Sequence, residues 1–139
     1  MQSGFKTYAA QILKNAKAME EVFRSAAVRM VGGGTSNHLI LADVYGSLGI
    51  SGKEAQSVLD EVGITVNMNA IADDVRKPMD PSGIRFGTPA ITTRGFGEKE
   101  SARVAELMIE ILRNPQDAEK KSVVRKEVKE LALKFPIPE

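Results

Sequence analysis

The sequence predicts an α+β domain of two layers, in which a small, mostly antiparallel sheet carries helices on one face. Three observations favour this fold class: one amphipathic helix opens the chain, two helices close it, and short apolar segments bounded by turn residues lie between them. Few of those segments are joined by a helix at the spacing of a parallel sheet. We expect residues 1–139 to form a single domain, with a first helix over 4–27, a body over 28–113 and a C-terminal helix over 114–135.

The first part of the chain is expected to hold one helix and two strands. Residues 4–27 repeat apolar side chains at three- and four-residue intervals, which places them on one helical stripe. Residues 28–31 and 39–44 are short apolar segments next to turn residues, as is typical of strands. A flexible connection is predicted after them, because three glycines follow at three-residue spacing: Gly46, Gly49 and Gly52.

A second helix is predicted from its end signals. Ser51 stands three residues before Glu54, the spacing of a capping box. Gly63 can adopt the left-handed conformation that ends a helix, and residues 65–68 follow as a strand.

The rest of the chain alternates between loop, strand and helix. Residues 69–82 are rich in Asp and Pro and are expected to form a loop, which leads into a short strand over 83–87. Residues 98–113 have one apolar face and are predicted to be helical. Asn114 is expected to cap the last helix, with Pro115 at its first position.

Composition excludes several classes of function. Lys and Arg number 19 and Asp and Glu 18, and this balance gives little support to a nucleic-acid or membrane partner. The absence of Cys and the single His exclude disulfides, a thiolate zinc site and a cysteine nucleophile. No signal peptide or membrane-spanning stretch is found, so we expect a cytoplasmic protein.

Arg85 is the leading candidate for ligand binding. Gly83 and Gly87 flank it at two-residue spacing and let the backbone approach a ligand. The planar guanidinium donates two parallel hydrogen bonds to a carboxylate, although an arbitrary surface arginine is more often simply solvated or ion-paired. Asn67 and Asn69 are two residues apart, so on a strand both side chains face the same side.

Other polar residues are weaker candidates. Arg94 can simply pair with the acidic start of the following helix, and His38 is more often a structural residue than a base at such a position. Asp43 is expected to have a structural partner within its strand. The glycine run 32–34 is interpreted as a turn, because no Gly-Lys-Ser/Thr and no helix follow it. We expect no catalytic residue, cofactor-binding residue or metal ligand in this chain.

Five short motifs occur together in one order and at one set of spacings. Together they closely resemble the C-terminal domain of serine hydroxymethyltransferase in its bacterial form, over residues 5–113. The resemblance implies the small domain of a pyridoxal-phosphate enzyme of fold type I, related to aspartate aminotransferase. The motifs are residues 33–39 (Gly-Gly-Thr-Ser-Asn-His-Leu), 49–53 (Gly-Ile-Ser-Gly-Lys), 66–69 (Val-Asn-Met-Asn), 82–90 (Ser-Gly-Ile-Arg-Phe-Gly-Thr-Pro-Ala) and 93–96 (Thr-Arg-Gly-Phe).

The resemblance also implies roles for two residues. In that family, pyridoxal phosphate moves a one-carbon unit between serine and glycine, and tetrahydrofolate is the carrier. Arg85 matches the arginine that grips the carboxylate of the amino acid, and Asn69 matches the asparagine that contacts the folate pterin ring. Three positions depart from the family pattern, where Asp, Lys and Thr are usual: Ser36, Met68 and Pro81.

The cofactor-binding parts of that family lie in its large N-terminal domain, and no segment here resembles them. A Schiff-base lysine needs a pKa lowered by burial, whereas every lysine here falls on a predicted solvated helix face, in a loop or near a terminus. We therefore expect a fragment or isolated C-terminal domain, inactive alone. Its parent enzyme would bind pyridoxal phosphate, glycine or serine, and folate. Within that enzyme, this domain would have the large pyridoxal-phosphate domain and the second subunit of a homodimer as partners.

Two other interpretations remain open. The chain could be a non-catalytic module that binds a small carboxylate or a partner subunit, or the small domain of another pyridoxal-phosphate enzyme of the aminotransferase type. In either case, a small domain on its own exposes faces that normally meet a large domain, and the first helix is the foremost of these. We therefore expect concentration-dependent self-association.

Overall fold

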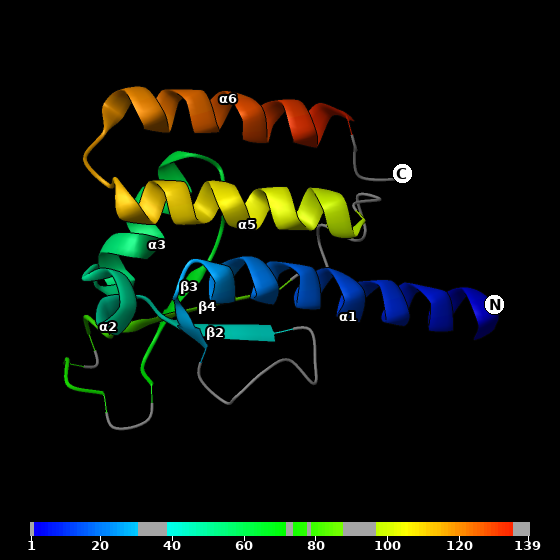
Figure 1. Ribbon diagram of the computed structural model, residues 1–139, viewed down its shortest axis with the longest axis horizontal. Helices are drawn as coiled ribbons and strands as arrows, with labels where there is room; N and C mark the ends of the chain where they lie inside the picture. The colour runs from blue at the N-terminus through cyan, green and yellow to red at the C-terminus, as the bar shows by residue number, and fades with distance from the viewer. Residues whose placement is uncertain (1, 31–38, 72–73, 78, 88–96, 135–139) are drawn as a thin grey trace.

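The computed structural model describes residues 2–30, 39–71, 74–77, 79–87 and 97–134 (Figure 1). These residues form helices and strands in the order α1 (Gln2–Ser25), β1 (Arg29–Met30), β2 (Leu39–Asp43), α2 (Val44–Leu48), α3 (Gly52–Glu61), β3 (Asn67–Asn69), β4 (Gly83–Gly87), α5 (Glu98–Arg113) and α6 (Ala118–Lys134).

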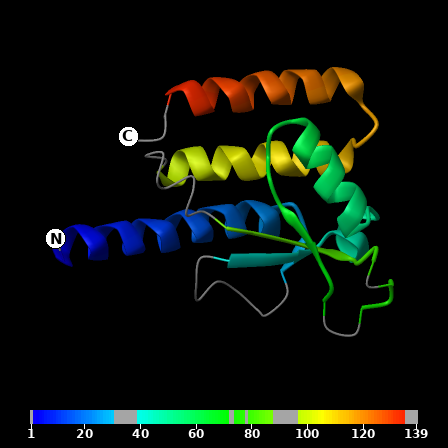
Figure 2. The same ribbon diagram turned by 180° about the vertical axis from the view of Figure 1, so that it is seen from behind.

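The four strands form one antiparallel sheet in the order β1-β2-β4-β3. Figures 1 and 2 show the long helices in layers on one side of this sheet, with α1 nearest to it, α5 next and α6 outermost. Helix α3 packs on β3 and β4 and also meets α5. The predicted α+β class, a small antiparallel sheet with helices on one face, is confirmed.

The core lies between the sheet and the helices. Ile84 and Phe86 of β4 are buried on the side of the sheet that faces the helices, and the ring of Phe86 lies 5.2 Å from that of Phe23 in α1. This tilted aromatic contact joins the first helix to the strand that carries Arg85. The largest other fully buried apolar side chains are Met19, Leu59, Leu107, Met108, Ile111 and Leu112.

The predicted ends of the second helix are confirmed in α3. The Ser51 hydroxyl accepts a hydrogen bond from the Glu54 backbone N–H at 3.2 Å, which is the N-cap that the spacing predicted. Gly63 has a φ of 85°, and the Ile64 N–H folds back to the Leu59 carbonyl at 2.9 Å. Local signals were therefore enough to set both ends of this helix.

The prediction of a flexible connection after the second strand is wrong. Residues Val44–Leu48 form the short helix α2, and the Asp43 side chain caps it by accepting a hydrogen bond from Gly46 N–H at 2.9 Å. Gly49 ends the helix with a φ of 77°. The glycines serve as helix and cap residues here, because the carboxylate of the preceding strand satisfies the exposed N–H.

The predicted cap of the last helix is also wrong. Asn114 ends α5 instead, and its side-chain amide donates to the Glu110 carbonyl at 2.9 Å. Helix α6 begins four residues later, where Asp117 Oδ1 accepts a hydrogen bond from the Lys120 N–H at 2.9 Å. Both Asn and Asp are good caps, and the sequence offered two of them within three residues of each other.

Other predicted bounds shift by one to a few residues. Helix α1 ends before residue 27, because Ala27 adopts the left-handed region with a φ of 63°. Strands β1 and β3 are shorter than or displaced from the predicted segments 28–31 and 65–68, whereas α5 spans the predicted residues. Residues 135 and beyond lie outside the described part of the chain, so the predicted end of the C-terminal helix is not placed.

Candidate functional site

Three of the candidate side chains share one face of the sheet. Arg85 of β4 pairs with Asn67 of β3, and residues directly opposite each other in an antiparallel pair point to the same side. Asn69 pairs with Gly83, two residues before Arg85, and therefore lies on that same side. The neighbouring Ile84 points the other way into the core. We call this surface the open face, defined by Arg85, Asn67 and Asn69.

Arg85 has its donors available on the open face. Its side chain is exposed, and no described residue forms an ion pair or hydrogen bond with its guanidinium. Arg29, on the same side of the sheet in β1, is by contrast paired with Asp43 at 3.2 Å. Arg85 can therefore receive an external anion without first breaking a pair with any of the described residues.

The two asparagines differ in how much of their amide group is already used. Asn69 is half-buried, and its Nδ2 donates to the carbonyl of Ala70 at 2.8 Å. Asn67 is exposed beside Arg85. Each amide can both donate and accept, which suits a ligand edge that mixes both kinds of group.

Gly83 allows the strands beneath the open face to pack closely. A Cβ atom at this position would lie 2.8 Å from the Asn69 carbonyl oxygen and 2.9 Å from a methyl carbon of Ile71. The sequence suggested that this glycine leaves room for a ligand, but the space is filled by protein. The residue thus lets β3 approach β4 and fixes Asn69 beside the Arg85 strand.

Strand β3 is also held from the helix side. The Met68 N–H donates to Gln56 Oε1 of α3 at 2.7 Å. This bond satisfies a backbone donor of a strand that has only one neighbour in the described sheet, and it fixes the stretch that carries both asparagines.

Asp74 is an organising residue of the loop between β3 and β4 that the sequence did not single out. Its Oδ1 accepts hydrogen bonds from the Ser82 hydroxyl at 2.6 Å and the Arg76 N–H at 2.9 Å. Its Oδ2 accepts from the Ser82 N–H at 3.0 Å and the Ile71 N–H at 3.3 Å. The bonds from Ser82, above all that of its hydroxyl, hold the pKa of Asp74 far below its usual range.

Arg76 and Asp80 close the same loop from inside. Arg76 donates from Nε to the Asp80 carbonyl at 2.9 Å and from Nη2 to the Asp80 carboxylate at 2.6 Å, and its guanidinium lies 4.6 Å from the ring centre of Tyr45 in α2. The Asp80 carboxylate raises the pKa of Arg76. The Ser51 hydroxyl and then the Arg76 guanidinium lower the pKa of Asp80. The described residues of this loop are therefore held in place by hydrogen bonds, an ion pair and a cation–π contact.

The weaker candidates have mixed outcomes. The prediction that Asp43 has a structural partner is confirmed, because it pairs with Arg29 and caps α2. His38, Arg94, Ser36 and the glycine run 32–34 lie outside the described residues. Within the described part, no group of three His, Asp or Glu residues could hold a metal ion, and no helix is long and apolar enough to cross a bilayer.

One comparison with known proteins bears on this face. The family model described as serine hydroxymethyltransferase matches residues 1–108, which is most of the chain and includes the strands β1 to β4 and the whole open face. The chain belongs to the serine hydroxymethyltransferase family. The family places the chain among transferases, and the observed fold is consistent with fold type I of the pyridoxal-phosphate enzymes. In the parent enzyme, the family implies pyridoxal phosphate, tetrahydrofolate and a homodimer.

The described residues of this chain do not fit pyridoxal phosphate. Every lysine whose side chain is described is exposed or half-buried, and two of them, Lys120 and Lys121, are paired with Glu110 and Glu61. A lysine that forms a Schiff base needs burial or a neighbouring cation to lower its pKa. The described lysines therefore offer no attachment point for the cofactor.

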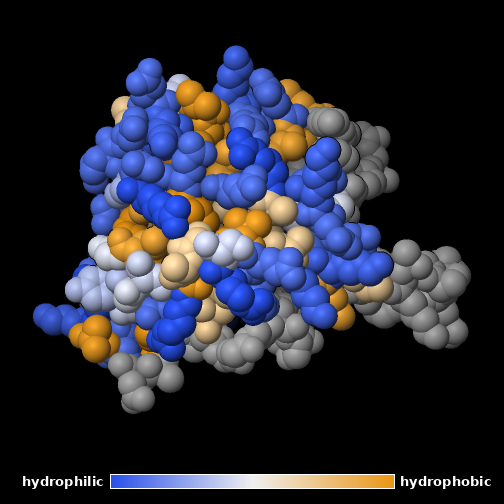
Figure 3. Space-filling model, viewed as in Figure 1, coloured by the Kyte–Doolittle hydropathy of each residue, from blue (hydrophilic) through white to orange (hydrophobic). Residues whose placement is uncertain are grey.

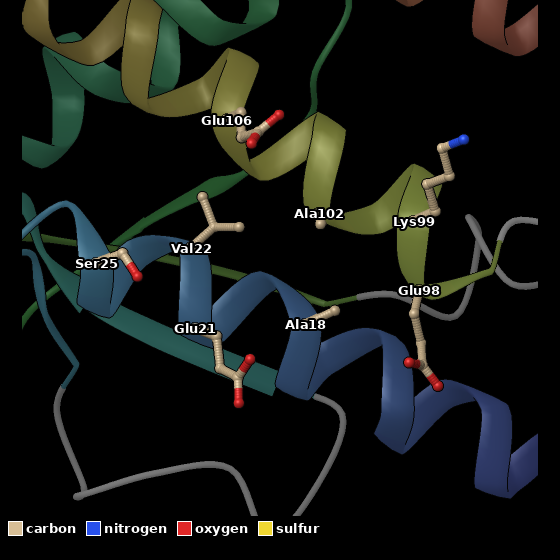
Figure 4. A pocket seen from close by; sticks show the side chains of 8 residues that line it. All are labelled: Ala18, Glu21, Val22, Ser25, Glu98, Lys99, Ala102 and Glu106. Carbon is tan, nitrogen blue, oxygen red and sulfur yellow. The ribbon is translucent and has the colours of Figure 1, made fainter.

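A groove between α1 and α5 does not change that conclusion. It has a volume of about 470 Å³, and Figure 4 shows carboxylates from both helices around small side chains. The face seen in Figure 3 is likewise mostly hydrophilic, with apolar patches between charged residues. The three carboxylates outnumber the single lysine, so the net negative charge of the groove would repel the phosphate of the cofactor. The lining residues are Ala18, Glu21, Val22, Ser25, Glu98, Lys99, Ala102 and Glu106.

Proposed function

We propose that this chain is the C-terminal, substrate-clamping domain of a bacterial-type serine hydroxymethyltransferase. The parent enzyme would convert serine and tetrahydrofolate into glycine and 5,10-methylenetetrahydrofolate. The observation that carries the proposal is Arg85, whose exposed guanidinium has no partner among the described residues and shares the open face with Asn67 and Asn69. Family membership supports the class of reaction.

Arg85 would bind the carboxylate of the amino acid. A guanidinium presents parallel N–H groups that match the two oxygens of a carboxylate, and such charge-assisted pairs are stronger than neutral hydrogen bonds. Strand β4 has a neighbour on each side, so the backbone that carries Arg85 is fixed by two strands. Arg85 would therefore bind the carboxylate through its positive charge and through the fixed position of its backbone.

Asn69 would contact the pterin ring of the folate. It lies diagonally across the strand pair from Arg85, a relation that separates residues by about 7–8 Å. That distance allows the amino acid and the folate to bind side by side. The amide can donate to and accept from the mixed edge of a pterin.

The chemistry itself would need the large domain. Pyridoxal phosphate supplies the electron sink for breaking the bond to the one-carbon unit, and its attachment lysine would lie outside this chain. We therefore expect the purified 139-residue protein to show neither the absorbance of bound pyridoxal phosphate nor cleavage of serine. Turnover by the pure chain would contradict this part of the proposal.

The test joins the chain to the cofactor-binding domain of an active family member and measures the KM for serine. Arg85→Ala is expected to raise it about 100-fold, because two hydrogen bonds to a charged group together contribute about 3 kcal/mol. Lys126→Ala is the matched control, since it removes the same charge from an exposed position on α6. An unchanged KM in Arg85→Ala would contradict the proposal.

A second candidate function is a non-catalytic module that binds a small carboxylate or a partner subunit. The Arg85 guanidinium, which has no partner among the described residues, favours it equally, since this does not depend on a large domain. Calorimetry with glycine separates the two. Binding of glycine at millimolar concentration that Arg85→Ala abolishes favours the non-catalytic module. The isolated clamping domain is instead expected to bind glycine weakly, because part of the binding site is missing and the remaining contacts cannot offset the cost of association.

A further inference from the structure

The carboxylate of Asp74 ties together the two ends of the loop that separates Asn69 from Arg85. One end is Ile71, two residues after Asn69, whose N–H donates to Asp74 Oδ2 at 3.3 Å. The other is Ser82, three residues before Arg85, which donates its N–H at 3.0 Å and its hydroxyl at 2.6 Å. A single side chain therefore contacts the chain just after β3 and just before β4.

Ser82 is held on its other side as well. Its carbonyl accepts a hydrogen bond from the Tyr45 N–H of α2 at 3.0 Å, and it is almost fully buried. The preceding residue, Pro81, accepts from the Gly52 N–H of α3 at 2.7 Å. The start of β4 is thus held by two helices, by its pairing with β3 and by the Asp74 carboxylate. Asp74 adds a side-chain link to the β3 side beyond the pairing of Asn69 with Gly83.

We propose that Asp74 is a positioning residue for substrate binding, which sets the placement of Arg85 relative to Asn69. This inference rests on the proposed function of those two residues. Asp74 would touch neither the amino acid nor the folate and would act through Ser82 and Ile71.

The contacts require a carboxylate. Both oxygens of Asp74 act only as acceptors, and each receives two donors. In Asp74→Asn one oxygen becomes an NH₂ group, which has no lone pair to offer and would face N–H or O–H donors. The isosteric change would therefore break up to two contacts and push the loop away from Ser82 or Ile71. Neighbouring donors also keep the pKa of Asp74 low, so the group remains ionised at neutral pH.

The experiment compares Asp74→Asn with Asp117→Asn. Both changes remove a carboxylate that accepts backbone N–H groups, but Asp117 caps α6, away from the open face. Backbone residual dipolar couplings of the 139-residue chain report how the segment 82–85 is oriented relative to β3. In the fused enzyme, the KM and kcat for serine give the functional readout.

Asp74→Asn is expected to change the couplings of residues 82–85 and to raise the KM for serine about tenfold, as the loss of one charge-assisted contact would. Asp117→Asn is expected to change only couplings near the start of α6. Unchanged couplings in folded Asp74→Asn, or changed couplings with an unchanged KM, would overturn the proposal. Should Asp74→Asn fail to fold, Ser82→Ala removes the hydroxyl bond alone and is expected to give smaller changes in the same two readouts; no change in either would also overturn it.

The outcome is separable from that of the proposed function. If Arg85→Ala leaves the KM unchanged, the proposed function fails, and the couplings still decide whether Asp74 orients the strand. If Arg85→Ala raises the KM but Asp74→Asn does not, the proposed function stands and the positioning role fails.

Discussion

Gly52→Ala tests whether the start of β4 is as tightly held as the structure indicates. Gly52 is the first residue of α3, and its N–H donates to the Pro81 carbonyl at 2.7 Å. A Cβ atom here would lie 2.3 Å from the Gly83 carbonyl oxygen and 2.9 Å from the Pro81 carbonyl oxygen. Both are backbone atoms, so neither can rotate away, and α3 must separate from the strand that carries Arg85.

The expected cost follows from two terms. Overpacking of a close contact costs about 1–3 kcal/mol, and weakening the hydrogen bond to Pro81 costs about 0.5–1.5 kcal/mol. Alanine offsets up to about 1 kcal/mol because it favours helix more than glycine does. The net loss of unfolding free energy is therefore about 0.5–4.5 kcal/mol, and the middle of this range, about 2–3 kcal/mol, lowers Tm by roughly 6–15 °C in a domain of this size.

Thermal and urea unfolding followed by circular dichroism measure this loss. Gly97→Ala is the matched control, because it also changes a glycine at a helix start, yet its Cβ would meet only a Glu100 side-chain oxygen at 3.4 Å. We expect the control to cost about 0.5–1 kcal/mol, the difference between glycine and alanine as N-cap. A Gly52→Ala protein as stable as the native one would refute the close packing of α3 against β4.

Three other predictions concern the core, the loop and the surface. Phe23→Ala is expected to destabilise the fold by about 3–5 kcal/mol, because it leaves a cavity at a fully buried site against Phe86. The control Leu133→Ala changes a side chain that is 72% exposed and is expected to have almost no effect. Urea unfolding measures the stability of both variants. The pKa of Asp74 is lowered in the fold, so its stabilising contribution is complete above the unfolded pKa of about 4 and is lost as pH falls further. Acid unfolding of Asp74→Asn should therefore depend less on pH below about 4 than that of the native chain, and equal slopes would count against the Asp74 contacts. The chain is expected to self-associate as its concentration rises, and Val22→Lys in the α1–α5 groove is expected to reduce this self-association. Sedimentation of the native chain as a monomer at high concentration would exclude self-association.

Helix ends and apolar faces were predictable from the sequence where the signal is local. The residues of α5 agree with the prediction because a regular apolar stripe runs between Gly97 and Asn114. The Ser51 cap and the Gly63 stop of α3 are also local, since each satisfies backbone groups within five residues.

The short helix α2 and the start of α6 were not predicted correctly from the sequence. Helix α2 is only five residues long, and it forms because Asp43 at the end of β2 caps it. The glycine spacing alone indicated a loop at that position. Asn114 was assigned to the wrong helix because Asn114 and Asp117 are both good cap residues, and the sequence alone does not decide between them.

The open face was predictable only in part. The glycine context pointed to Arg85, and the two-residue spacing placed Asn67 and Asn69 on one side of a strand. Their position beside Arg85 depends on the register of β3 against β4, which is set across a loop. The Asp74 contacts with Ser82 span eight residues of that loop, and no local pattern distinguishes them from an ordinary turn.

The most direct test of the account is a crystal structure of the fused enzyme with glycine bound. Both carboxylate oxygens of glycine are expected about 2.7–2.9 Å from guanidinium nitrogens of Arg85, the distance of a charge-assisted pair. A glycine carboxylate held by other residues, with Arg85 left in solvent, would contradict it.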